Sequence, residues 1–307
     1  MFVNDLPDNI QSGCLLYADD VKIYRKITSP SDGQLLQNDL NQLRAWSVRW
    51  GLKLNPSKCK SFTMTLRRAP VQTKYFIGST ELEHVKEIRD LGVILDSKLT
   101  FSSHVDNIVK RANRGLGLLI RSFQSGSNGS KFKRSALMAA YYANVRSILE
   151  YCSVIWAGAA DSHMVRVDRV QHKFLMWLIH HSCSGQTDSL SYQNLLHHFQ
   201  IPSLAARRVQ HDLLFIRNIF HAKLDVPNLI ADFSLHVPIR STRTQSLFHV
   251  PRARVNTVQH GMFCRLPRLT NQFVCDRTVE VDFFADDFNS YKAQVIRYVA
   301  RSGMILE

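Results

Sequence analysis

Two adjacent aspartates near the start of the chain, Asp19 and Asp20, are the residues best suited by type and spacing to chemistry. They lie in the run GCLLYADDVKIY (residues 13–24), with apolar or aromatic residues on both sides. Such a run predicts two short strands joined by a tight turn, with the acids at its tip. Neighbouring carboxylates repel each other, and a hard divalent cation such as Mg²⁺ removes that repulsion. An ordinary solvated turn is the alternative, because Asp is common in turns.

The chain carries far more basic than acidic side chains. Its 307 residues include 39 lysines and arginines against 25 aspartates and glutamates, so its formal net charge is +14. With 45% hydrophobic and 21% charged residues, the composition is that of a folded globular protein rather than a disordered one. The charge favours a polyanionic partner, most simply nucleic acid, although a role in solubility alone is the alternative.

Cysteine usage and apolar segments predict a soluble intracellular protein without a membrane span. The six cysteines, at positions 14, 59, 152, 183, 264 and 275, form no CxxC pair, which argues against a zinc ribbon. Cys14 and Cys152 lie in apolar runs, and we expect them to be small buried residues in a reducing compartment. The first residues lack the features of a signal peptide, and the longest apolar runs, such as 174–179, are too short to cross a bilayer.

Residues 1–98 predict an α+β domain. After the hairpin, a Ser/Pro-rich break at residues 28–33 precedes an amphipathic helix that ends at Gly51. The apolar face of this helix consists of residues at steps of three and four, namely Leu36, Leu40, Leu43, Trp46 and Trp50. Shorter apolar runs then predict strands near residues 62–66, 75–77 and 91–95.

Residues 99–230 predict a helical domain, because the apolar period becomes helical at Ser102. After a flexible linker at 124–130, further helices are expected near residues 133–151, 162–180 and 203–222. In the last of these, Arg207 and Arg208 lie off the apolar face. A solvated surface and contact with phosphate remain equally open for them.

Residues 231–307 predict a third segment. Arginines alternate with Pro, Thr and apolar residues over 238–270, which indicates an irregular basic stretch. A final helix is expected from Phe288 to about Ser302.

The order of these segments resembles the reverse transcriptases of non-LTR (LINE-type) retrotransposons. The tetrapeptide at 17–20 resembles motif C, the second acidic site of the polymerase palm. The other resembling segments follow in the family's order: the end of the helix after motif B (2–7), motif D (50–59), motif E or the primer grip (90–101), and the helices after the palm (136–175 and 204–208). The resemblance runs from Phe2 to about Phe220 as a C-terminal fragment.

This resemblance implies a partial polymerase palm, a helical thumb and a basic C-terminal segment. It implies two-metal nucleotidyl transfer from dNTP to a DNA primer on an RNA template, in the nucleus or the cytoplasm. Asp19 and Asp20 would then bind Mg²⁺. Residues implied to contact the primer or nucleic acid are Tyr17, which would otherwise pack in the hairpin core, Lys58, Leu91, Gly92, Val93, Arg207 and Arg208.

The family's motif A aspartate and motif B loop have no counterpart in this sequence. Two metal ions need several convergent carboxylates, so we expect the chain alone to be inactive. The run FADD at 284–287 imitates the motif, but it precedes a helical pattern and predicts a helix start. A non-catalytic nucleic-acid-binding protein and a non-functional remnant of a mobile element are the alternatives.

Overall fold

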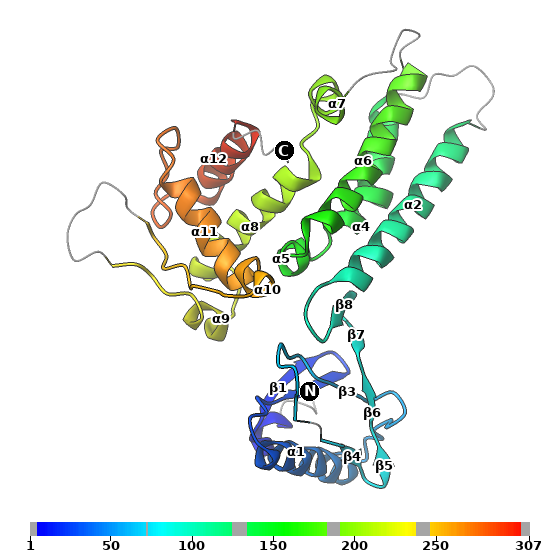
Figure 1. The fold of residues 1–307 in the computed structure, drawn as a ribbon, viewed down its shortest axis with the longest axis vertical. Coiled ribbons are helices and arrows are strands. Elements are labelled where there is room, and N and C mark those ends of the chain that lie inside the picture. Colours follow the sequence, from blue (N-terminus) through cyan, green and yellow to red (C-terminus); the bar gives the residue numbers. More distant parts are fainter. Residues whose placement is uncertain (1–4, 72, 125–133, 183–190, 238–245, 302–307) are drawn as a thin grey trace. The chain divides into compact units, whose positions relative to one another are not determined.

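A computed structural model describes residues 5–71, 73–124, 134–182, 191–237 and 246–301 of the chain (Figure 1). The chain divides into two compact units, Met1–Leu99 and Thr100–Glu307, here called the N-terminal and the C-terminal unit. The predicted linker at 124–130 and the first residues of the segment resembling the helix after motif B lie outside the described residues, Gln124 excepted.

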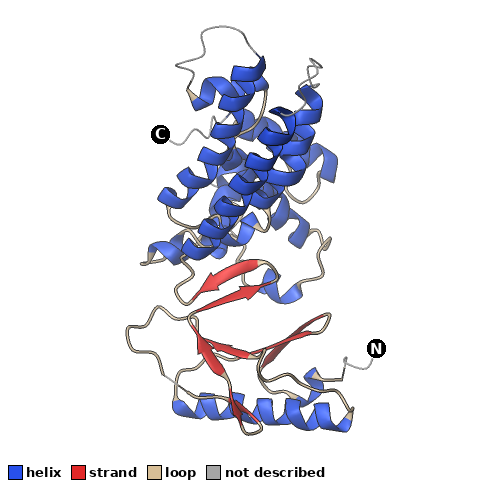
Figure 2. Cartoon of the chain, turned by 90° about the vertical axis from the view of Figure 1, so that its right-hand side faces the viewer, coloured by secondary structure: helices blue, strands red, loops and turns tan. Residues whose placement is uncertain are grey.

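The N-terminal unit combines one long helix with short paired strands. Every described strand lies within residues 13–96 (Figure 2), and each sheet has two strands. The elements in chain order are a 3₁₀ turn (Pro7–Asn9), β1 (Gly13–Tyr17), β2 (Asp20–Tyr24), α1 (Pro30–Arg49), β3 (Lys60–Phe62), β4 (Phe76–Ile77), β5 (Thr80–Glu81), β6 (Glu83–Val85), β7 (Glu87–Asp90) and β8 (Val93–Asp96). The pairs β1–β2, β4–β5 and β7–β8 are antiparallel hairpins, and β3–β6 is parallel.

Helix α1 provides the apolar platform of this unit. Leu43 and Trp46 from the predicted apolar face are buried together with Leu6, and side chains of β1 and β2 pack against this cluster. The helix starts at Pro30, inside the segment predicted as a break, because Asp32 binds back to the preceding turn. Its carboxylate accepts hydrogen bonds from the backbone N–H groups of Thr28 and Ser29, both at 2.8 Å. Gly51, with φ of 68°, follows the helix as predicted.

Two predicted strands need correction. The strand near 62–66 ends at Phe62, and Met64 and Leu66 are exposed. The strand predicted at 91–95 is interrupted at its start, because Leu91 and Gly92 form the turn of the β7–β8 hairpin. Both turn residues have positive φ, 43° and 91°, which is the requirement of a type I′ hairpin turn.

The C-terminal unit is helical. Its helices are α2 (Ser102–Gln124), α3 (Arg134–Tyr141), α4 (Ser147–Glu150), α5 (Ser153–Trp156), α6 (Asp161–Ser182), α7 (Tyr192–Phe199), α8 (Leu204–Phe220), α9 (Pro227–Ala231), α10 (Asn256–Gln259), α11 (Met262–Val274) and α12 (Phe288–Arg301), with a π-helical turn (Tyr142–Arg146) between α3 and α4. The predicted helices near 102, 133–151, 162–180, 203–222 and 288–302 are all present. None of the helices in the described part of the chain is long and apolar enough to cross a membrane.

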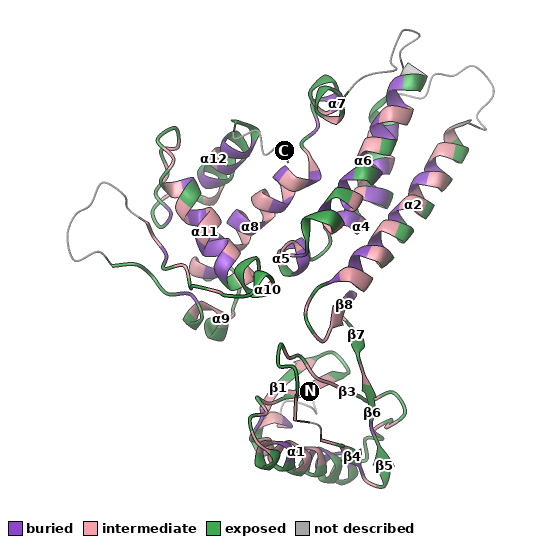
Figure 3. Cartoon of the chain, in the orientation of Figure 1, coloured by how far each residue is buried: buried purple, intermediate pink, exposed green. Residues whose placement is uncertain are grey.

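Helix α8 is the centre of a core that continues into the last third of the chain. Its Leu213 and Ile216 belong to one buried cluster with Leu266 and Phe273 of α11 and Val295 of α12. Figure 3 shows buried positions along α8, α11 and α12. The structure therefore does not separate the predicted segment 231–307 from the helices before it.

The basic stretch predicted as irregular contains a regular helix, α11, because its apolar residues recur at helical spacing despite the proline at 267 inside it.

The structure also bears on two smaller predictions. Asp287 accepts hydrogen bonds from the N–H groups of Asn289 and Ser290, so the acids before α12 do start that helix. Cys152 is exposed rather than buried, while Cys14 is half-buried.

Candidate functional site

The acidic pair lies at the end of a regular two-residue hairpin, as predicted. Tyr17 and Asp20 are paired across β1 and β2, which leaves Ala18 and Asp19 as the two central turn residues. Ala18 has a φ of 53°. A positive φ at the first central residue is shared by the type I′ and II′ turns, whose twist matches that of the strands. All four residues of the tip are exposed.

The two faces of the hairpin differ in their surroundings. Leu16, Val21 and Ile23 pack on the α1 cluster. Tyr17 lies on the opposite face and is 62% exposed, so it is not part of the hairpin core. Leu15 and Tyr24 are also more than half exposed. The chain therefore presents an apolar and aromatic surface directly behind the acidic tip.

Two carboxylates are too few for a two-metal centre. Asp19 and Asp20 are adjacent and open to solvent, which suits oxygen ligands for one hard cation. Among the described residues, no group of three His, Cys, Asp or Glu side chains is positioned to hold a metal ion. The described residues thus fit part of a magnesium site and do not complete one.

An ion pair links the acidic hairpin to the segment predicted as the primer grip. Lys22 of β2 binds the carboxylate of Asp90 at the end of β7, and both side chains are about one-third exposed. Asp90 pairs with Val93 across the turn formed by Leu91 and Gly92. This contact could not be predicted from the sequence, because 68 positions separate the two charges and neither lies in a spacing pattern.

The three residues of the predicted primer grip have unlike environments. Leu91 is 45% exposed at the turn, whereas Val93 is buried. Gly92, at a φ of 91°, occupies a conformation that an L-residue rarely adopts. The geometry therefore exposes Leu91 at the turn and places Val93 in the core.

Lys58 lies in an exposed turn of the N-terminal unit. Its backbone N–H donates to the carbonyl of Asn55 at 3.1 Å, and the Asn55 side chain also accepts from Ser57. No hydrogen bond or ion pair between described residues ties its ammonium group to the hairpin tip. This environment is that of a surface lysine after a turn.

Arg207 and Arg208 are held inside the C-terminal unit, which differs from both predicted alternatives. Arg207 forms a two-pronged ion pair with Glu150, with Nη2 2.8 Å from Oε2. Arg208 is buried, and its Nη1 lies 3.5 Å from Oδ1 of Asp168. Burial raises the pKa of Asp168 against the lowering effect of Arg208. Both arginines therefore neutralise internal carboxylates, and neither is a solvated surface residue or placed for phosphate.

A basic stripe on α2 is a cationic feature of this unit that was not singled out from the sequence. Its exposed members at helical spacing are Asn107, Lys110, Arg111, Arg114, Leu118 and Arg121. Residues of the opposite face, such as Ile108 and Leu116, are buried. The four cations extend over about 16 Å of helix at 1.5 Å per residue. In the sequence, the signal for this stripe was that the basic residues recur every three or four positions, between the apolar residues of the same helix.

Part of this chain is similar to known proteins. Residues 1–95 match the family model described as reverse transcriptase (RNA-dependent DNA polymerase). A probable RNA-directed DNA polymerase from transposon X-element of Drosophila melanogaster is 29% identical over 158 residues, 51% of this chain and 17% of that protein. The RNA-directed DNA polymerase from mobile element jockey of Drosophila funebris is 29% identical over 165 residues, 52% of this chain and 17% of the relative.

A third relative, a probable RNA-directed DNA polymerase from transposon BS of Drosophila melanogaster, is 30% identical over 159 residues and covers 51% of this chain and 17% of the relative. No solved structure matches the chain. The matched part spans about one-sixth of each relative, so these proteins are much longer than the shared region. The chain thus shares its first 95 residues with the reverse transcriptase family and about half of its length with polymerases of Drosophila mobile elements.

Proposed function

We propose that this chain is part of the RNA-directed DNA polymerase of a non-LTR (LINE-type) retrotransposon. The observation that carries the proposal is the exposed acidic hairpin within the region that matches the reverse transcriptase family. In this proposal the N-terminal unit is a partial palm, and the helices that follow it form the thumb and post-palm region.

The proposed roles of the residues follow from their positions. Asp19 and Asp20 would contribute oxygen ligands to Mg²⁺, which in this family supports nucleotidyl transfer from dNTP. The β7–β8 turn at Leu91 and Gly92 would contact the DNA primer, and Tyr17 would lie against the same strand. The ion pair of Lys22 with Asp90 supports this assignment, because it holds the acidic tip and the primer-contacting turn in one unit.

We propose further that the chain alone does not polymerise. The support is the incomplete carboxylate set among the described residues. Primer extension on an RNA template with Mg²⁺ tests this, with no product expected from the chain. Robust extension that Asp19→Ala abolishes would contradict the proposal, because it would show that another group completes the site. Extension that survives Asp19→Ala would indicate a contaminating polymerase, which a repeated purification should remove.

A non-catalytic nucleic-acid-binding role is the second candidate, and the α2 stripe favours it. Lys110, Arg111 and Arg114 lie on the exposed face of a helix whose other face is buried, which places their charges where a phosphate backbone could approach. Filter binding of RNA at several salt concentrations tests this role. Lys110→Glu with Arg114→Glu should reduce both the affinity and its salt dependence, whereas Asp19→Ala should change neither. Binding unaffected by the two charge reversals would refute the assignment to α2.

A further inference from the structure

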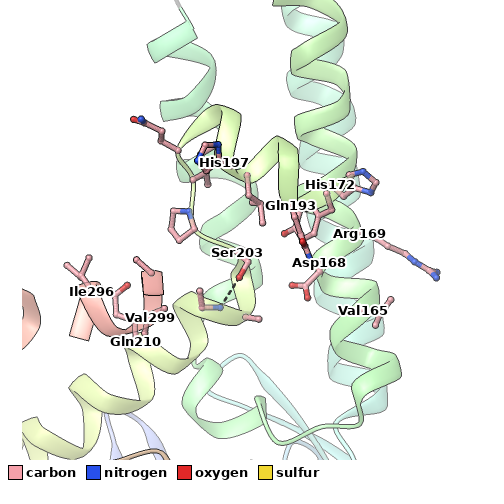
Figure 4. A pocket seen from close by; sticks show the side chains of 18 residues that line it. Val165, Asp168, Arg169, His172, Gln193, His197, Ser203, Gln210, Ile296 and Val299 are labelled. Atoms are coloured by element: carbon pink, nitrogen blue, oxygen red, sulfur yellow. Dashed lines mark hydrogen bonds between the residues drawn. The ribbon is translucent and has the colours of Figure 1, made fainter. Parts of the chain in front are cut away.

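The C-terminal unit contains an open cavity of about 610 Å³ that the proposed polymerase role does not use. Side chains from α6 and α7, the segment between α7 and α8, and parts of α8 and α12 line it. In Figure 4, Ile296 and Val299 lie on one side and Val165, Asp168 and His172 on the other, with Ser203 between them. Its volume is in the range of sites that hold a ligand or several side chains of a partner.

The walls of the cavity are largely apolar and partly open to solvent. Val165 on α6 is 40% exposed and Ile296 on α12 is 48% exposed, on facing sides. Leu196, Ile201 and Ala206 continue the apolar lining between them. Exposed apolar side chains on both walls of one trough are typical of surfaces that bind another molecule, unlike scattered surface residues.

Several polar groups near the cavity are paired within the protein, while Nε2 of His172 is buried without a hydrogen-bond partner among the described residues. Arg208 pairs with Asp168, the acidic residue of the lining. Tyr192 donates its hydroxyl to Gln171 at 2.8 Å, and Gln171 in turn donates to the carbonyl of Pro202 at 3.2 Å. These bonds hold α6, α7 and the start of α8 in place, so the trough is preformed.

The charge that remains at the edge of the cavity is positive. Arg169, at the outer edge of the α6 wall, makes no hydrogen bond or ion pair with another described residue. His172 and His197 add imidazoles to the same lining, while the Asp168 carboxylate is compensated by Arg208. An occupant with apolar side chains and flanking carboxylates would complement both the walls and this edge.

We propose that this cavity binds an amphipathic helix from an acidic protein partner. The apolar side chains of such a helix, at i, i+3 or i+4, and i+7, would fill the space between Val165 and Ile296, and its carboxylates would face Arg169. The proposal is independent of the polymerase role, because the cavity lies wholly within the C-terminal unit. Nucleic acid is a poorer match, since the lining offers apolar walls and a single unpaired arginine.

Fluorescence anisotropy with two designed helical peptides of about 16 residues tests this. Both carry leucines at the spacing above; one has glutamates at the remaining positions and the other has lysines. The full-length chain should bind the glutamate peptide more tightly than the lysine peptide. No binding of the glutamate peptide up to about 1 mM would overturn the proposal, as would equal affinity for the two peptides.

Substitutions on the walls locate the binding. Ile296→Glu should weaken the glutamate peptide by about tenfold or more, because it places a carboxylate in the apolar wall. Val258→Glu is the matched control: Val258 is 46% exposed on α10 and does not line the cavity. Arg169→Glu should lower the ratio of the affinity for the glutamate peptide to that for the lysine peptide by about two- to fivefold, the effect of one exposed charge.

Three outcomes would refute the assigned site or occupant. Equal weakening by Val258→Glu would place the binding elsewhere. Displacement of the glutamate peptide by RNA from the wild-type chain would identify the trough as a nucleic-acid site. A change from dimer to monomer caused by Ile296→Glu, measured by light scattering, would identify a second copy of the chain as the occupant.

Discussion

The buried ion pair of Arg265 with Asp212 should be the most sensitive polar contact of the C-terminal unit. Arg265 on α11 donates from Nε to Oδ2 of Asp212 at 2.8 Å and from Nη2 to Oδ1 at 3.2 Å. It also donates to the carbonyls of His260 and Val154, at 2.8 and 2.7 Å. The Asp212 side chain is 1% exposed. One guanidinium therefore joins α11 directly to α8 and α5.

We expect Arg265→Met to lower the free energy of unfolding by about 3–5 kcal/mol, because it leaves a buried carboxylate without its partner. That is a large fraction of the about 5–15 kcal/mol that stabilises a typical domain. Asp212→Leu combined with Arg265→Met removes both charges. The double variant should be at least about 2 kcal/mol more stable than the sum of the single losses predicts.

Urea unfolding followed by far-UV circular dichroism measures these losses, because the signal comes mainly from the helices of the C-terminal unit. The pH dependence provides a second check. Burial raises the pKa of Asp212 and Arg265 lowers it, so Arg265→Met should leave the pKa further raised. A folded state that binds the proton more tightly than the unfolded state gains stability as the pH falls. The loss caused by Arg265→Met should therefore be smaller at about pH 5 than at about pH 7.

A loss below about 1 kcal/mol for Arg265→Met would refute this reasoning, because it would show that the Asp212 carboxylate finds water or another donor. Strictly additive single and double variants would refute it as well. In either case the pair would not be the contact that joins the three helices.

Three further predictions concern backbone and surface positions. Ala18→Gly should stabilise the acidic hairpin by about 0.5–1 kcal/mol, seen as a higher midpoint of thermal unfolding of the N-terminal unit, because φ is 53° at this turn position. Gly115→Ala should destabilise the packing of α2, since a Cβ atom would lie 2.9 Å from a backbone oxygen of the π-helical turn. Gly117→Ala, which meets open space, should instead raise the free energy of unfolding by up to about 1 kcal/mol, and urea unfolding measures both variants. Asp90→Asn should speed amide exchange in the hairpin at low salt but little at high salt, because its ion pair with Lys22 is partly exposed; equal effects at both salt concentrations would contradict this.

Local patterns predicted most regular elements. The apolar and aromatic residues on both sides of the acidic pair Asp19-Asp20 were sufficient to place the β1–β2 hairpin and its turn. The periodic apolar residues of α2 placed that helix, and Gly51 marked the end of α1. These features depend on interactions within about ten residues, which a sequence displays directly.

Features that depend on distant residues could not be predicted. The turn at Leu91 and Gly92 was hidden in a continuous apolar run, because only the pairing of β7 with β8 reveals it. Arg207 and Arg208 pair with Glu150 and Asp168, which lie 57 and 40 positions earlier, so these ion pairs follow from tertiary packing alone. Helix α11 was missed because its proline and arginines resemble a loop composition.

We propose that Asp19 and Asp20 form the exposed part of an incomplete metal site. Paramagnetic broadening of backbone amide signals during titration with Mn²⁺ tests it most directly. We predict broadening centred on Ala18 and Asp19, with weak affinity of about millimolar order, that is lost when both aspartates are replaced by asparagine. Binding of two ions at micromolar concentrations, or broadening centred elsewhere in the chain, would contradict the account.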